Sequence, residues 1–364
     1  MARGALPGAD VTRLTWAFGA NVDALGQQRY EQQVQQALAA LPEAAGWAFI
    51  STRLAPFRSP LADVRRVPDR LMERAPATVA RLVGALAYPR GLIHRFDLRL
   101  PPAGAREVTT VHGLEPWRFD DEGGRPRWLE AEARRSFGAI TPSAFTAAEV
   151  TSVLGVARVW AVPHGLGAQW TGPALLTGEQ LAGLGITCPF VLHAAGATKR
   201  KNLEALAQAW PHVQASTGAQ LVLSGSEHAR RTALFAGMPA VRLIGRQPDD
   251  VLLGLMSSAS VVVVPSLYEG FGLPALEAMS CGTPVVAANR AALPEVCGDA
   301  ALLVEPDAAA LAGGLVEVLT RPDLAARLSA AGTRRAGDFT WRAAALAHLA
   351  VYEELAAAQR RVGT

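Results

Sequence analysis

The sequence predicts an α/β protein made of two doubly wound units, each with a parallel sheet covered by helices on both faces. Short apolar, β-branched runs alternate with helical stretches along the whole chain, which is typical of parallel sheets. A length of 364 residues suffices for two domains of ordinary size, about 100 to 200 residues each. A glycine-rich, aperiodic stretch from His164 to Gly178 divides the runs into two sets, and we place the linker there.

Each unit has six strand candidates. In residues 1–167 they are 11–18, 46–52, 92–96, 107–113, 137–142 and 158–163. In residues 168–344 they begin at Phe190, Gln220, Val241, Val261, Pro284 and Ala301. Because ligands bind beyond the carboxyl ends of such strands, we expect a substrate site in a cleft between two facing sheets. A helix over 345–364 has apolar residues at helical spacing and is expected to pack back onto the first unit.

Composition favours a soluble, cytoplasmic protein. No apolar run approaches the roughly 20 residues that span a bilayer, and the first residues do not form a secretory signal. The three cysteines lack CxxC spacing, so we expect packing residues without disulfide or metal, at Cys188, Cys281 and Cys297. Residues 1–167 carry a net charge of +4 and the remainder −1. The arginines between Arg53 and Arg99 form either a solvated face or a surface for an anionic acceptor or the inner face of a membrane.

The most informative stretch runs from Val261 to Val286 and predicts a strand, a glycine-rich loop, a helix and a second strand. Pro274 suits the first helical turn, because its missing N–H is not needed there. The amides of Gly272, Leu273 and Ala275 are therefore predicted to be free to bind an anion. Glycine at position 272 also lets the backbone approach a diphosphate closely.

Two carboxylates flank the start of this helix. Glu269 lies before it and Glu277 about one turn inside, so they should contact separate parts of a polyhydroxyl ligand. An alternative is that Glu277 complements the helix dipole. In the same way, Tyr268 and Phe271 could be ordinary core aromatics.

The second motif begins at Gly196, directly after a predicted strand, and places three cations before a helix whose expected N-cap is Asn202. Cations at a helix N-terminus are unfavourable unless an anion neutralises them, so Lys199, Arg200 and Lys201 indicate a phosphate site. These two lysines are the only ones in the chain. The alternative is a solvated loop with accidental charges.

Together these motifs resemble glycosyltransferase family 4, retaining enzymes with two facing Rossmann-like domains, known as the GT-B fold. The resemblance covers nearly the whole chain and is strongest from Gly196 to Trp341. In order, the matching segments are RKN at Arg200, IGR at Ile244, PSLYEGFGLPALEAM at Pro265, GTPVV at Gly282, LPEV at Leu293, GDAALLV at Gly298 and FTW at Phe339.

The resemblance implies a donor site in the second unit. Arg200 and Lys201 would neutralise the donor diphosphate, Glu277 would bind the ribose hydroxyls, and Glu269 would hold the transferred sugar. The other donor-binding positions would be Gly196, Arg246 and Gln247 near the base, and the amides of Phe271, Gly272 and Leu273. No metal or other cofactor is implied, since cations and helix amides neutralise the charge. The donor would be a substrate such as GDP-mannose or a UDP-hexose.

The resemblance is looser in the first unit, where the acceptor would bind. His112 would lie near the reacting sugar, although a strand-end histidine can also be a satisfied structural residue. Gly26, Arg29 and Tyr30 would lie at the cleft. His164 stands where related enzymes have asparagine. The acceptor would be a saccharide or a lipid-linked molecule, and no nucleic acid is expected.

The resemblance implies transfer of a mannosyl or glucosyl group to an acceptor hydroxyl with retention of anomeric configuration. The pathway would be polysaccharide, glycolipid or glycoconjugate biosynthesis. Two alternatives stay open: a nucleotide-sugar epimerase of the same fold and a non-catalytic partner subunit. The sequence leaves the base, the sugar, the acceptor and the oligomeric state open.

Overall fold

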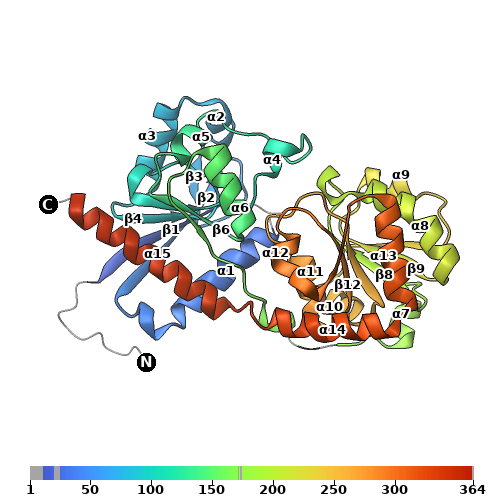
Figure 1. Cartoon of the computed structure of the whole chain (residues 1–364). Coiled ribbons are helices and arrows are strands. Elements are labelled where there is room, and N and C mark those ends of the chain that lie inside the picture. The colour runs from blue at the N-terminus through green and yellow to red at the C-terminus, as the bar shows by residue number, and fades with distance from the viewer. Residues whose placement is uncertain (1–10, 20–24, 171, 173, 363–364) are drawn as a thin grey trace. The chain divides into compact units, whose positions relative to one another are not determined.

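The computed structural model describes residues 11–19, 25–170, 172 and 174–362 (Figure 1). Contacts along the chain divide it into two compact units. Unit 1 comprises residues 1–114, 123–165 and 341–364. Unit 2 comprises residues 115–122 and 166–340, so a short segment from the first half of the sequence belongs to it.

The described part of unit 1 holds a seven-stranded parallel sheet in the order β3-β2-β1-β4-β5-β6-β7. Its strands are β1 (Thr12–Gly19), β2 (Trp47–Pro56), β3 (Arg65–Val67), β4 (Leu92–Arg95), β5 (Glu107–Thr110), β6 (Gly138–Thr141) and β7 (Val159–Ala161). Its helices are α1 (Leu25–Ala39), α2 (Asp69–Arg74), α3 (Ala77–Ala87), α5 (Leu129–Ala133), α6 (Ala144–Glu149) with a π-helical turn at Val150–Leu154, and α15 (Trp341–Val362).

The described part of unit 2 holds a six-stranded parallel sheet in the order β10-β9-β8-β11-β12-β13. Its strands are β8 (Phe190–Ala194), β9 (Gln220–Ser224), β10 (Val241–Gly245), β11 (Val261–Val264), β12 (Val285–Ala288) and β13 (Leu302–Val304). Its helices are α4 (Glu115–Arg118), α7 (Gly178–Gly183), α8 (Leu203–Thr217), α9 (Ala229–Phe235), α10 (Asp249–Ser258), α11 (Leu273–Ser280), α12 (Leu293–Cys297), α13 (Ala308–Thr320) and α14 (Pro322–Ala336).

The predicted α/β class and all twelve strand candidates are confirmed. The edge strand β3 was missed because its three residues, Arg-Arg-Val, do not form an apolar run. It forms by pairing with β2, and Arg65 Nη1 donates to the carbonyl of Ala87 at 2.7 Å. The C-terminal helix begins at Trp341 rather than at 345.

The strand orders fix where each sheet can bind a ligand. Both sheets reverse the direction of their connections once, between β1 and β4 in unit 1 and between β8 and β11 in unit 2. In open parallel sheets the ligand crevice lies outside the carboxyl ends of the strands at this switch point. The loops that leave β8 and β11 are those of the two cationic and glycine-rich motifs.

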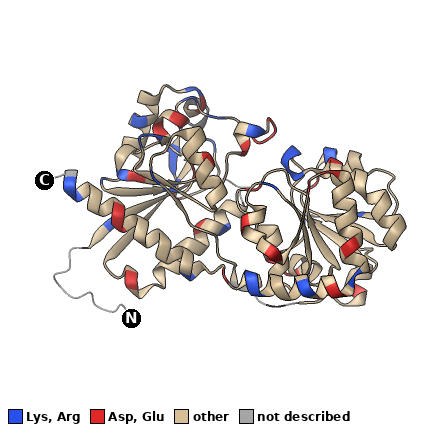
Figure 2. Cartoon of the chain, viewed as in Figure 1, with Lys and Arg blue, Asp and Glu red and all other residues tan. Residues whose placement is uncertain are grey.

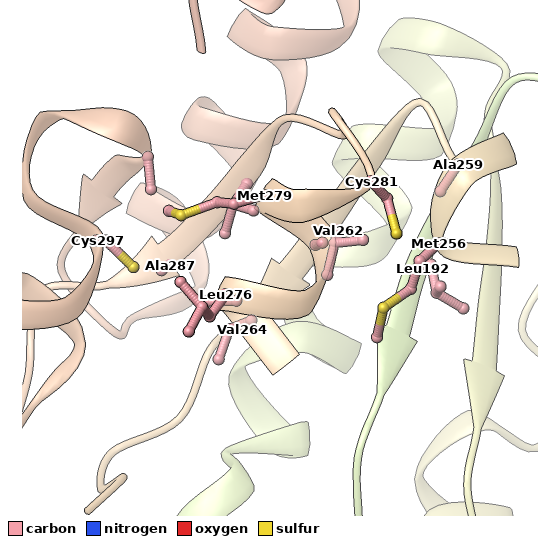
Figure 3. Close-up of a cluster of buried hydrophobic side chains, with 14 of the residues drawn as sticks. Leu192, Met256, Ala259, Val262, Val264, Leu276, Met279, Cys281, Ala287 and Cys297 are labelled. Carbon is pink, nitrogen blue, oxygen red and sulfur yellow. The ribbon is translucent and has the colours of Figure 1, made fainter. Parts of the chain in front are cut away.

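The core of unit 2 is apolar and includes two of the three cysteines. Cys281 and Cys297 are buried beside α11, whose Leu276 and Met279 pack onto the sheet (Figure 3). Cys188 is exposed, so its predicted packing role is wrong. It lies in the turn before β8, whose buried run starts at Phe190. Most charged residues lie on helices and loops (Figure 2). Among the described residues, no helix combines the length and apolar character needed to cross a membrane.

A network of buried aromatic and histidine side chains joins α15 to the sheet of unit 1. Tyr352 accepts a hydrogen bond from Trp16 Nε1 at 3.3 Å, and its hydroxyl lies 2.7 Å from Nδ1 of His94. His94 Nε2 lies 2.7 Å from the hydroxyl of Thr110. Because burial removes hydration from the imidazolium, the pKa of His94 is well below its ordinary value. The network therefore holds a neutral ring.

A second buried histidine, His348 on α15, completes this network. Its Nδ1 lies 2.7 Å from the carbonyl of Ala344, which can only accept, so Nδ1 carries the proton. Its Nε2, 2.8 Å from the hydroxyl of Tyr30, then accepts. Burial lowers the pKa of His348 from 6.5 to about 4.

We expect the fold to lose stability as pH falls from about 6.5 towards 4. In this window the unfolded chain binds the proton that the buried His348 excludes, so unfolding becomes favoured, by up to about 3 kcal/mol. His348→Gln should lower the thermal midpoint at pH 7 but give a shallower decline with acid. The exposed His212→Gln is the control. Calorimetry would measure the thermal midpoint against pH for the parent and the two variants. Identical profiles for all three proteins would contradict the assignment of a neutral His348.

Candidate functional site in unit 2

The three cations after β8 form a single 3₁₀ turn, Lys199–Lys201, which leads into α8. Asn202 joins the two with a left-handed backbone (φ 54°) and makes no side-chain cap, so its predicted capping role is wrong. N-cap residues usually have an extended backbone, which Asn202 does not. Instead its Nδ2 donates to the carbonyls of Pro265, at 3.0 Å, and Pro306, at 2.8 Å. These bonds hold the cationic turn against the loops that follow β11 and β13.

The loop between β11 and α11 is fastened to the same turn through the backbone. The amide of Leu267 donates to the carbonyl of Arg200 at 2.8 Å. Arg200 Nη1 in turn donates to the carbonyl of Tyr268 at 3.3 Å. The two motifs, more than sixty residues apart, therefore form one structure at the switch point.

A buried ion cluster lies at their junction. The Glu269 carboxylate, 7% exposed, accepts from Lys201 Nζ at 2.6 Å and from Arg200 Nη1 at 3.0 Å. Ser266 donates to it at 2.8 Å. Burial alone would raise the pKa of Glu269, but the two cations hold it at about 2. The carboxylate is thus ionised at all working pH values and positions both cations.

The start of α11 requires glycine. Gly272 has φ 113°, and a Cβ there would lie 2.8 Å from Leu293 Cδ2. Pro274 occupies the first turn as predicted. The amide of Ala275, however, donates to the carbonyl of Gly272 at 3.0 Å, so the prediction that it is free to bind an anion is wrong.

The remaining predicted residues of this helix start differ in exposure. Phe271 is buried in the core, with its ring centroid 5.6 Å from that of Phe339. Leu273 and Glu277 are half-buried within α11. Glu277 follows Glu269 by eight positions, one on the helix and one in the loop before it.

Three further residues that were predicted to bind the donor lie at the same carboxyl edge of the sheet. Gly196 is exposed after β8, with open space where a Cβ would lie. Arg246 and Gln247 follow β10, which is the edge strand. Arg246 is exposed, and Gln247 Nε2 donates to the carbonyl of Ile244 within its own loop. Among the described residues, neither Arg246 nor Gln247 forms a hydrogen bond or ion pair with the Glu269 cluster.

Sequence reasoning missed an acidic segment that pairs with the same cations. Glu122 Oε1 lies 2.7 Å from Arg200 Nε, and Asp120 lies 2.7 Å from Lys199 Nζ. Asp121 accepts from the amide of Lys199 at 2.7 Å. Figure 2 shows these acids in the loop after α4. The signal was present as a run of three acids, Asp120–Glu122, complementary to the run of three cations.

The predicted acceptor-side residues belong to unit 1. Gly26 is exposed in the first turn of α1, Arg29 is half-buried, and Tyr30 is 3% exposed and bonded to His348. His112 follows β5, its ring edge-on to Tyr30 with centroids 4.7 Å apart. Among the described residues its Nε2 is shielded from solvent and has no hydrogen-bond partner. Burial lowers the pKa of His112 to about 4, so the ring is neutral at neutral pH.

His164, which stands where related enzymes have asparagine, also lies in this part of unit 1. The ring is buried, 4.6 Å from Tyr30 and 6.1 Å from Trp341 between centroids. Burial keeps the pKa of His164 well below its ordinary value. The side chain thus belongs to the aromatic core beneath α15.

The sequence is similar to those of known proteins. Residues 189–321 match the model of the family described as Glycosyl transferases group 1. O-antigen chain mannosyltransferase B of Escherichia coli is 30% identical over 277 residues, 70% of this chain and 72% of that protein. The MMP alpha-(1->4)-mannosyltransferase of Mycolicibacterium hassiacum is 47% identical over 111 residues, 29% of this chain and 27% of that protein.

A solved structure shows the same fold. Sucrose-phosphate synthase from Thermosynechococcus elongatus superimposes with a TM-score of 0.73 at 24% identity. The match covers 95% of this chain and 100% of that chain. This likeness confirms the predicted two-sheet architecture.

The two lysines of the cationic turn should differ in their contribution to stability. Lys201→Ala leaves part of the buried Glu269 carboxylate unpaired and should lower the free energy of unfolding by about 3 kcal/mol. Lys199→Ala removes only a solvent-screened pair with Asp120 and should change it little. Urea denaturation of both variants measures the difference. Equal losses would show that Lys201 is not held in a buried ion pair.

Proposed function

The chain belongs to the glycosyltransferase group 1 family, and on that premise we propose that it is a retaining hexosyltransferase with a nucleotide-diphosphate-sugar donor. The observation that carries the proposal is the Lys201, Arg200 and Glu269 cluster beside the start of α11. Two cations and a helix N-terminus meet there at the switch point of a parallel sheet. This arrangement suits a diphosphate with a polyhydroxyl group attached.

The cations supply the main catalytic effect in this proposal. As the bond between the anomeric carbon and the phosphate oxygen breaks, negative charge builds up on the leaving diphosphate. Lys201 and Arg200 are already positioned by Glu269, so they stabilise that charge without reorganising. Arg200 has five N–H donors and can bind a phosphate while it remains bonded to Glu269.

We propose front-face attack by the acceptor hydroxyl. The new bond joins its oxygen to the anomeric carbon as the bond to the phosphate oxygen breaks, and the hydroxyl proton passes to that leaving oxygen. The configuration is then retained without a covalent enzyme intermediate. Glu269 would hold hydroxyls of the transferred sugar and Glu277 those of the ribose. A neutral His112 would donate or accept a hydrogen bond at the sugar.

The similarity to mannosyltransferases favours a mannosyl donor, and GDP-mannose is the donor that we would test first. UDP-hexoses are the alternative. The acceptor would be a saccharide or a lipid-linked saccharide in polysaccharide, glycolipid or glycoconjugate biosynthesis. Incubation of the sugar nucleotide without an acceptor separates transfer from epimerisation, because only an epimerase would form an epimer of the donor.

Loss of a diphosphate-binding cation should weaken nucleotide binding in a phosphate-dependent way. We expect Lys201→Ala to reduce the affinity for GDP at least tenfold, a loss of about 1.4 kcal/mol or more. Guanosine, which lacks phosphate, should bind both proteins equally. Isothermal titration calorimetry provides the values, with Lys199→Ala as the control. A Lys201→Ala protein that binds GDP as tightly as the parent would rule out this diphosphate site.

The acidic segment should compete with the donor for Arg200. Glu122→Gln removes the charge that pairs with Arg200 Nε at 2.7 Å, so GDP should bind several-fold more tightly. Asp120→Asn is the matched control, because Asp120 pairs only with the exposed Lys199 in the described contacts. Weaker GDP binding by Glu122→Gln would instead mean that Glu122 positions Arg200 for the donor.

A further inference from the structure

Unit 1 has a cavity beside α1, outside the site described above. The cavity has a volume of about 300 Å³ and lies at the carboxyl ends of β1 and β2, where Gly19 and Arg53 line it. The segment 61–64 forms another wall. A second cavity of about 270 Å³ also contains Gly19 and extends to Asp97, after β4. The volume of the first cavity lies at the lower end of the range for ligand pockets, roughly 300 to 1,000 Å³.

One face of α1 provides most of the polar lining. The residues are Gln28, Glu31, Gln32 and Gln35, which follow helical spacing of three and four positions. Tyr30 of the same helix is buried and bonds to His348. The helix thus directs its amides and one carboxyl group to the cavity and its aromatic ring to the core.

Glu31 is an unusual member of this lining. It is 6% exposed, and its Oε1 has no hydrogen-bond partner among the residues that the structure describes. A buried oxygen without a partner is costly, and a ligand that donates a hydrogen bond would remove that cost. Burial, together with the negative charge of Asp97, raises the pKa of Glu31 to about 8. At neutral pH the carboxyl group therefore carries a proton and can both donate and accept.

The lining matches hydroxyl groups better than it matches charges. Each glutamine amide donates and accepts, as a sugar hydroxyl does. The side chains of Phe18, Leu61 and Val64 offer apolar contact for the C–H faces of a sugar ring. Among the described residues of the lining, Arg53 is the one cation. The proposed diphosphate site of unit 2 instead has Lys201 and Arg200 within hydrogen-bond distance of one carboxylate.

We propose that this cavity binds an uncharged saccharide segment of the acceptor, held by Glu31 and by the amides of Gln28, Gln32 and Gln35. The inference rests on the proposed function and adds to it the chemical class of the acceptor: a neutral glycan rather than a phosphorylated sugar. It also moves the acceptor contacts on α1 away from Tyr30, whose hydroxyl is bonded within the core. Gly19 leaves space for a ring beside the backbone, because a Cβ there would meet only Leu100, at 3.8 Å.

Binding of mannotriose to the full-length chain tests the proposal without relying on turnover. Isothermal titration calorimetry would measure mannotriose and, separately, mannose 6-phosphate, each with GDP present. The variants are Gln32→Ala and Glu31→Ala. The control is Gln36→Ala, because Gln36 is an exposed glutamine of the same helix that does not line the cavity.

We expect the parent and Gln36→Ala to bind mannotriose with equal affinity, and Gln32→Ala to bind it at least threefold more weakly. Glu31→Ala should weaken binding at least tenfold while GDP still binds normally. Absence of mannotriose binding, equal binding by all four proteins, or a preference for mannose 6-phosphate would each overturn the proposal. Normal GDP binding in any of these cases would leave the proposed donor site intact, so the two failures are distinguishable.

Discussion

The candidate site depends on one buried carboxylate. Glu269 accepts hydrogen bonds from Lys201, Arg200 and Ser266, and so joins two loops that are distant in sequence. Without it, two cations would lie beside each other and close to a helix N-terminus, where their mutual repulsion and the helix dipole oppose them. The carboxylate therefore makes it possible to keep positive charge in place before any ligand arrives. That is the form of preorganisation that stabilises a leaving diphosphate.

The acidic segment, residues 120–122, neutralises further charge on the cationic turn. Asp120, Asp121 and Glu122 come from the sequence directly after β5 and α4, yet they pair with the cationic turn of unit 2. Lys201 pairs with Glu269 in the loop before α11, whereas Lys199 pairs with the acidic segment and Arg200 pairs with both. A donor diphosphate would therefore meet Lys201, which stays paired with Glu269, and Arg200, which would release Glu122 to bind the phosphate.

The sequence predicted much of the fold because parallel strands and their helices leave a strong periodic signal. All twelve apolar strands were found, while β3, with two arginines and one valine, had no such signal and depends on pairing with β2. The electrostatics of helix starts predicted an anion site at each motif, and the resemblance implied that Lys201 and Glu269 share one donor site. The acidic partners were not predicted, since pairing between residues 120–122 and 199–200 is a tertiary contact that local patterns do not specify.

Errors of detail had local physical causes. Asn202 has a left-handed backbone, so its side chain bonds to two neighbouring loops rather than to its own helix. The face of α1 that carries Gln28, Glu31, Gln32 and Gln35 was passed over because glutamines on a helix usually indicate a solvated surface. That face is distinguished by the cavity and by the buried Glu31 Oε1, which has no hydrogen-bond partner in the described part of the chain.

The most direct test of the central claim is a crystal structure of the chain with GDP bound. The account predicts the two phosphates within hydrogen-bond distance of Lys201 Nζ and the Arg200 guanidinium, at the start of α11. Phosphates bound at another place, with Lys201 and Arg200 still contacting only carboxylates and carbonyls, would contradict it.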